Sequence, residues 1–131
     1  MKLDENNYVD LAEKAIKKLE AMTNPKTGKK ISMATTSKIR NLLAMTAEIY
    51  NEVQNSSGEL LSNDIKGRIN YLKIRVVYEA GREPSVKNLV ETAEILQHID
   101  EIRGNKKQYI LFSRYMEALV AYRKFYGQND D

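Results

Sequence analysis

His98 is the single histidine of this 131-residue chain, and the sequence contains no cysteine. A thiolate nucleophile is therefore excluded, and so is a metal site built on paired imidazoles or thiolates. Asp100 and Glu101 are neighbours, but on a helix their side chains point about 100° apart and form no general acid–base pair. The chain also lacks a glycine-rich phosphate loop, a G-x-S-x-G motif and an aspartate-rich metal motif. We therefore expect no catalytic residue, no bound metal and no cofactor.

Basic side chains in the middle of the chain have the spacing of two helical stripes. Arg68 and Arg75 are seven residues apart, and Lys66 and Lys73 repeat the same interval. On a helix this interval spans two turns, and the two pairs flank the apolar face on opposite sides. The segment from residue 65 to 78 contains no acidic residue, although the net charge of the whole chain is only +3. The distribution of charge is therefore more informative than its total.

Aromatic residues beside the arginine stripe extend its possible chemistry. Tyr71 and Tyr78 could stack on bases while the arginines bind phosphate. The other interpretation is that the basic side chains lay their stems over the rim of the core and keep their charged groups in water. The residue pattern leaves both interpretations open.

A second basic set surrounds the start of another predicted helix. Lys38 and Arg40 lie where a positive charge opposes the helix dipole, so a ligand anion explains them better than helix stability does. The block from residue 21 to 47 has no acidic residue. Its other basic residues lie in the preceding loop: Lys26, Lys29 and Lys30.

Apolar residues at three- and four-residue spacing predict the helices that would position these groups. No alternating strand pattern competes with them. We expect an all-α, compact bundle of about five helices. The chain should form a single domain over residues 1–131, with its core within about residues 6–127. The helices are expected near residues 8–22, 36–53, 62–80, 84–100 and 106–126.

Individual residues predict where the helices begin and end. Thr35 or Thr36 should cap the second helix. Gly81 is expected to end the third helix as a C′ glycine, with Pro84 in the first turn of the fourth. Gly67 falls inside the third helix at a cost of about 1 kcal/mol, which suggests close packing against a neighbour or a partner.

No apolar segment approaches the length of about 20 residues that a membrane-spanning helix needs, and the N-terminus lacks a signal-peptide pattern. We expect a cytoplasmic protein with no membrane partner.

Three segments together resemble one known family. They are Thr35–Leu43, Tyr71–Glu83 and Arg114–Gly127, and they resemble the small subunit of type III-A (Csm) CRISPR effector complexes. The similarity extends from Asn7 to Gly127. The sequence departs from the family in the long, lysine-rich loop 22–33 and after Gly127, where a second glycine is usual.

The resemblance implies a non-catalytic, all-helical subunit in antiviral defence. Several copies would stack into a filament beside the backbone subunits that hold the CRISPR RNA, with the large subunit at one end. Implied partners are the CRISPR RNA, the target RNA, the backbone and large subunits and further copies of the chain, with no small-molecule substrate. The candidate RNA-binding residues, most of them within the matching segments, are Lys38, Arg40, Arg68, Lys73, Arg75, Arg82 and Arg114.

An alternative from another class is a pure assembly module whose basic stripes meet acidic patches on neighbouring subunits, without direct RNA contact. A DNA-binding helix-turn-helix regulator is disfavoured, because the third predicted helix is too apolar around its circumference for a recognition helix.

Overall fold

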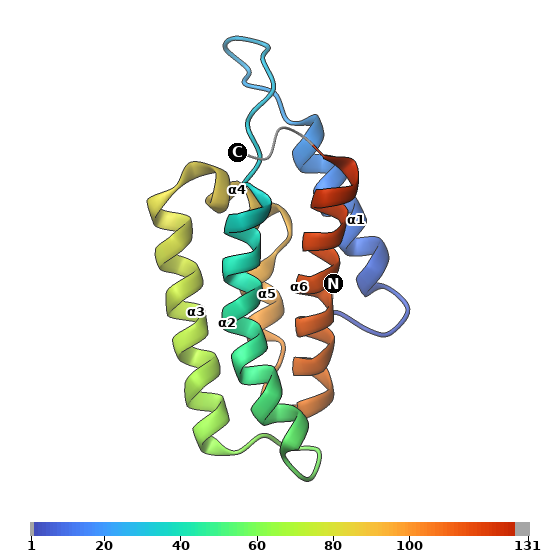
Figure 1. Ribbon diagram of the computed structural model, residues 1–131, viewed down its shortest axis with the longest axis vertical. Helices are drawn as coiled ribbons and strands as arrows, with labels where there is room; N and C mark the ends of the chain where they lie inside the picture. Colours follow the sequence, from blue (N-terminus) through green and yellow to red (C-terminus); the bar gives the residue numbers. More distant parts are fainter. Residues whose placement is uncertain (1, 128–131) are drawn as a thin grey trace.

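The computed structural model describes residues 2–127 and contains six α-helices in that range. Their bounds are α1 (Tyr8–Ala21), α2 (Thr36–Asn55), α3 (Asn63–Arg82), α4 (Pro84–Thr92), α5 (Ile95–Asp100) and α6 (Lys106–Tyr126). No β-strand occurs among the described residues, where only two isolated bridges are found. The predicted all-α bundle is confirmed (Figure 1). Residues 128–131, where the sequence departs from the family pattern, lie outside the described part of the chain.

Helix α6 is the centre of the bundle. It packs against α1 on one side and α2 on the other (Figure 1). Because it has neighbours on several sides, its buried residues cover more than one face, and they include Tyr109, Phe112, Tyr115, Met116 and Leu119. Burying aromatic and aliphatic side chains of this size supplies much of the hydrophobic stabilisation of a small domain.

Helix α3 lies at the edge of the bundle, where it packs on α4, α2 and α5. Its buried stripe is the predicted one, with Ile65, Ile69, Leu72 and Val76 facing the core. The opposite face of α3 is exposed to solvent. An edge helix of this kind has room for a ligand or a partner on its outer side.

Side-chain caps fix the starts of the three long helices that follow α1. The hydroxyl of Thr35 accepts a hydrogen bond from the backbone N–H of Lys38 at 3.3 Å, so Thr35 rather than Thr36 caps α2. Ser62 caps α3 and Asn105 caps α6 in the same manner. These caps satisfy backbone donors that the first helical turn leaves unpaired.

The predicted fourth helix is wrong as one continuous element, because it is divided into α4 and α5. Glu94 adopts a left-handed conformation with φ +53° and separates the two helices. The α4 spacing, continued without a break, leads from Ala93 to Leu96 and then to Asp100. The break shifts the buried face, so that Ile95 and Ile99 enter the core instead.

The expected role of Gly81 is also wrong. Helix α3 continues through Gly81 to Arg82, and Glu83 is its C-cap. Glu83 is extended, with φ −135° and ψ 122°. This is the conformation that a following proline imposes on the residue before it, so Pro84 ends α3 and starts α4.

Gly67 does not show the expected close packing within the chain. A Cβ atom at this position would meet no atom within 4 Å. The space beside Gly67 is open and belongs to the groove described below.

Candidate nucleic-acid interface

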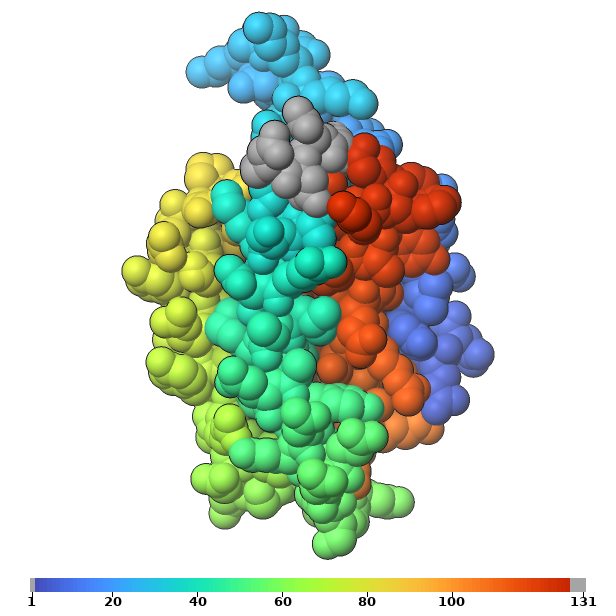
Figure 2. Space-filling model, viewed as in Figure 1, coloured from blue at the N-terminus to red at the C-terminus, as the bar shows by residue number. Residues whose placement is uncertain are grey.

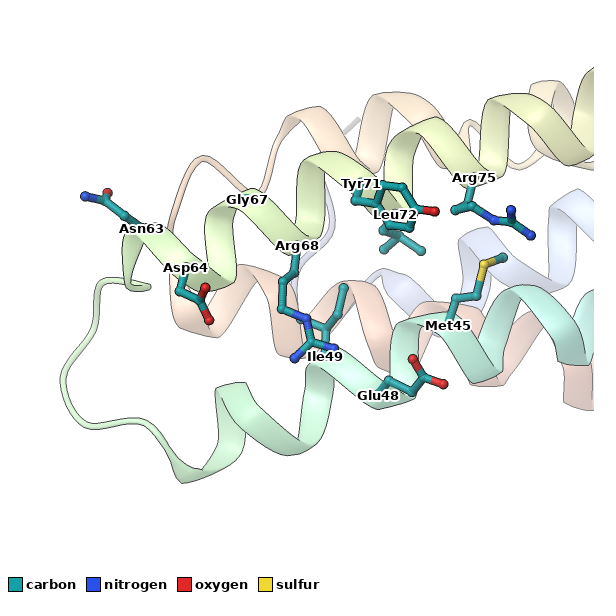
Figure 3. A pocket seen from close by; sticks show the side chains of 10 residues that line it. All are labelled: Met45, Glu48, Ile49, Asn63, Asp64, Gly67, Arg68, Tyr71, Leu72 and Arg75. Atoms are coloured by element: carbon teal, nitrogen blue, oxygen red, sulfur yellow. The ribbon is translucent and has the colours of Figure 1, made fainter.

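A groove runs between α2 and α3, which we call the α2–α3 groove. It consists of two hollows, of about 620 Å³ and about 450 Å³, which share Met45 and Arg75 (Figure 3 shows the first). Its floor is apolar, with Met45, Ile49 and Leu72 between the helices. Its walls carry four basic and four acidic side chains: Lys38, Arg68, Arg75, Arg82, Glu48, Asp64, Glu79 and Glu83.

The structure gathers four of the seven candidate residues in this groove, namely Lys38, Arg68, Arg75 and Arg82. They come from separate parts of the sequence. The α2 N-terminus and the α3 C-terminus lie side by side, because α2 and α3 run antiparallel. The predicted arginine stripe therefore faces α2.

Three of these four cations form ion pairs with acids of the same chain. Arg68 donates to Glu52 across the groove, and the hydrogen bond and charge of Glu52 raise the pKa of Arg68 above its usual value. Lys38 pairs with Glu83, which joins the start of α2 to the end of α3. Arg82 pairs with Glu79 at 3.0 Å. The sequence reasoning missed these acidic partners, because the pairs that join α2 to α3 lie far apart in the chain.

Arg75 differs from the other groove cations. It lies where the two hollows meet, is half-buried, and takes part in none of the ion pairs between described residues. Its guanidinium carbon lies 5.7 Å from the ring centroid of Tyr78, and that of Arg82 lies at the same distance. Tyr78 therefore receives two cation–π contacts at one end of the groove.

Lys73 lies on the other side of α3. Its ammonium group is 2.6 Å from a carboxylate oxygen of Asp100 in α5. Lys66 and Lys73 line a separate hollow with α5, which confirms that the lysine and arginine stripes flank the core face on opposite sides.

Arg40 and Arg114 are exposed on α2 and α6, and neither lines the groove. The seven candidates therefore lie on several surfaces rather than one.

The outer face of α3 carries a feature that the sequence reasoning only partly identified. Tyr71, Ile74, Val77 and Tyr78 are between 49% and 62% exposed, which is unusual for large apolar side chains at helical spacing. We call these four residues the α3 outer face. The two tyrosines were noted in the sequence, whereas Ile74 and Val77 belong to an i, i+3 repeat that could have identified this second apolar side.

Three buried titratable side chains, His98, Tyr109 and Tyr115, have structural roles in the core. His98 is buried in α5, its ring centroid lies 4.9 Å from that of Tyr115, and burial lowers its pKa. Tyr109 and Tyr115 donate to the backbone carbonyls of Thr46 and Ala93 at 2.6 and 2.8 Å, and burial raises the pKa of both phenols.

Over residues 2–127 no cluster of three His, Asp or Glu side chains is placed to hold a metal ion. No helix within this range is both long and apolar enough to cross a membrane.

Comparison with known proteins identifies the family. The family model described as Csm2 Type III-A matches residues 9–129. A protein of Streptococcus thermophilus named CRISPR system Cms protein Csm2 is 44% identical over 128 residues, which is 98% of both chains. A protein of the same name from Mycobacterium tuberculosis is 34% identical over 130 residues, 99% of each chain, and one from Enterococcus italicus is 41% identical over 98 residues, 73% of this chain and 70% of that protein. The chain therefore belongs to the Csm2 family and is a non-catalytic small subunit of a type III-A CRISPR complex.

Proposed function

We propose that this subunit holds RNA in the assembled Csm complex by binding the phosphate backbone without reading sequence. The α2–α3 groove supports this proposal most directly, because Arg75, which has no ion-pair partner among the described residues, lies beside exposed tyrosines on one accessible surface. Phosphate contacts position a protein on a strand, whereas base pairing to a guide supplies specificity. The bound RNA would be the target strand and its duplex with the CRISPR RNA.

The ion pairs of Lys38, Arg68 and Arg82 are compatible with this role. Their side chains are substantially exposed, and exposed ion pairs contribute little to stability. A phosphate can therefore replace the carboxylate partner at small cost. The groove is charge-balanced as it stands, so binding by one copy should be weak. Several copies stacked along a filament, beside the backbone and large subunits, would supply avidity.

The remaining candidates would add contacts outside the groove. Arg40 and Arg114 are exposed and absent from the ion pairs between described residues, so both are available to a phosphate. Lys73 would bind phosphate only by leaving Asp100. We further propose that the chain acts as one domain inside the bacterial cytoplasm.

The test is charge reversal at Arg40 and Arg75 in the reconstituted complex. The double variant Arg40→Glu/Arg75→Glu should retain less target RNA at moderate salt, and its affinity should depend less steeply on salt, because fewer counterions are released on binding. A matched control is Lys14→Glu/Lys18→Glu, which reverses two exposed charges on α1. Unchanged retention in the Arg40→Glu/Arg75→Glu variant, or an equal loss in the control, would contradict the proposal.

A second candidate function is assembly of the complex through protein contacts alone. The α3 outer face favours it, since exposed apolar side chains in a contiguous row are typical of protein interfaces. The variant Ile74→Lys/Val77→Lys should then reduce incorporation of the subunit into the complex, whereas Gln97→Lys, at an exposed position on α5, should not. Crosslinking within the purified complex separates the two functions, because crosslinks from α3 to protein only would favour assembly and crosslinks to RNA would favour the phosphate role.

A further inference from the structure

The connection between α1 and α2 forms a hairpin-like loop closed by a single antiparallel bridge, which we call the lysine finger (residues 22–31). The backbone N–H of Ile31 donates to the carbonyl of Met22 at 2.9 Å, and that of Asn24 donates to Lys29 at 2.8 Å. Thr23 and Lys30 form an antiparallel bridge. Gly28 has φ +70°, the left-handed conformation that glycine adopts at a hairpin turn. The finger therefore has a defined backbone.

The lysine finger projects from the end of the bundle into solvent. Figure 1 shows it extending past the ends of α1 and α2, and Figure 2 shows it standing clear of the molecular body. All of residues 23–30 are exposed. Its tip buries no apolar surface, so core packing does not explain its presence.

The base of the lysine finger is anchored in the bundle. Met22 and Met33 pack against the core, and Ala34 is buried. The buried side chain of Arg123 in α6 donates from Nε to the carbonyl of Ala34 at 2.9 Å. A fixed base and an ordered hairpin hold the tip in position before any partner binds, which lowers the entropic cost of binding.

Three lysines give the finger its chemistry, namely Lys26, Lys29 and Lys30. None of them takes part in the ion pairs found between described residues. No acidic residue lies between residues 21 and 47. Within residues 2–127 these three charges therefore have no ion-pair partner, in contrast to most of the cations of the α2–α3 groove.

We propose that the lysine finger is a separate phosphate-binding element that contacts a nucleic-acid strand beyond the end of the bundle. This inference rests on the proposed function only in that it requires RNA in the complex. The tip combines positive charge with hydroxyl and amide groups at Thr23, Asn24 and Thr27, all of which can bind phosphate oxygens. Within the exposed residues 23–30 Pro25 is the single apolar residue, whereas an acidic protein partner would need an apolar centre to its interface.

The position of the finger supports the same conclusion. It leaves the bundle at the end where the α2 N-terminus meets the α3 C-terminus, which is also where Lys38 and Arg82 line the groove. A strand that follows the groove toward this end would approach the finger. The two elements would then contact the same strand.

The first experiment measures the salt dependence of binding to labelled single-stranded RNA by the full-length protein. The variant Lys26→Gln/Lys29→Gln/Lys30→Gln should bind more weakly at low salt, and the slope of log affinity against log salt should fall by about 2, since each lost contact to a single strand removes about 0.7. The control Lys14→Gln/Lys18→Gln/Lys87→Gln removes three exposed lysines from α1 and α4 and should change the slope by less than about 0.7. An unchanged slope in the finger variant would overturn the proposal.

The second experiment measures acetylation of lysine side chains in the assembled complex before and after ribonuclease treatment. The finger lysines should be protected in the intact complex and should become reactive once the RNA is digested. Protection that persists after digestion would assign the finger to an acidic protein surface and overturn the proposal, and so would full reactivity in the intact complex.

The two proposals fail separately. If Arg40→Glu/Arg75→Glu loses RNA and the finger variant does not, the finger is not a phosphate contact and the proposed function stands. If only the finger variant loses RNA, the finger contact stands and the proposed role of Arg40 and Arg75 fails. If neither variant loses RNA, both are wrong.

Discussion

His98 is a buried titratable group whose charge state affects the fold. Its ring packs edge-on against Tyr115, and burial lowers its pKa, while Glu94 and Glu101 partly oppose the shift. In the unfolded chain the imidazole has a pKa of about 6.5. As the pH falls below that value, the unfolded state binds a proton that the folded state excludes, so folding stability decreases. Well above a pH of about 6.5 the imidazole is neutral in both states, so the contribution of His98 to the free energy of unfolding no longer changes with pH.

We predict that the free energy of unfolding falls between about pH 7 and about pH 5.5 through His98. Urea denaturation across this range should show a smaller fall in His98→Phe, which keeps an aromatic ring against Tyr115 and cannot be protonated. An identical pH dependence in the two proteins would show that other groups cause it.

Gly67 affects the stability of the protein through its position in the interior of a helix. It lies in the interior of α3, and a Cβ atom there would meet nothing within 4 Å. Glycine costs about 1 kcal/mol relative to alanine in a helix interior. Nothing within the described chain requires a glycine at this position, so any requirement for it lies with a partner.

We predict that Gly67→Ala raises the free energy of unfolding of the isolated protein by about 1 kcal/mol, because the helix gains a better helix former without a clash. Thermal or urea denaturation measures the change. Gly58→Ala is the control with the opposite sign, since Gly58 has φ +83° and a side chain there is strained. Destabilisation by Gly67→Ala would contradict the open space beside α3.

The break between α4 and α5 places Glu94 in a conformation that costs a non-glycine residue about 1–2 kcal/mol. We predict that Glu94→Gly stabilises the protein by about 1 kcal/mol by relieving this strain. Glu94→Ala also removes the carboxylate but keeps the strain, so it should give no such gain. Equal effects of the two substitutions in urea denaturation would assign the change to the lost charge instead.

The whole molecule is organised around α6, which buries residues on several sides, whereas α3 buries one stripe. All six helices contribute residues to the core, and the α3 outer face and the exposed residues 23–30 of the lysine finger lie outside it. Substitutions in these two surfaces should change binding without unfolding the chain.

We predict that Phe112→Ala destabilises the protein by about 3–5 kcal/mol, because Phe112 is fully buried and its removal leaves a cavity. Tyr71→Ala on the α3 outer face should change stability by less than about 0.5 kcal/mol. Both proteins should unfold in one urea transition by fluorescence and by circular dichroism, as one cooperative domain does. Separate transitions would contradict the single domain that we propose.

The sequence alone predicted most of the helices, because their apolar spacing is a local property of the chain. The buried stripe of α3 and the opposite placement of the Arg68 and Lys73 stripes follow from helical periodicity. The α2 cap was predicted at Thr35 or Thr36, and the structure selects Thr35. The division of the fourth helix did not follow. The pattern through Ala93 and Leu96 is compatible with one helix, and only packing against the rest of the core selects the register that buries Ile95 and Ile99.

The sequence by itself determined the helical class, the absence of thiol and paired-imidazole sites, and the location of the acid-free basic blocks. Only the tertiary structure decided which charges meet. Three ion pairs join residues that are far apart in the chain: Lys38 with Glu83, Arg68 with Glu52 and Lys73 with Asp100. The packing of the helices also leaves the lysine finger extended into solvent. The physical reason is that helical periodicity is set by neighbouring residues, whereas ion pairs and exposure depend on how complete helices pack.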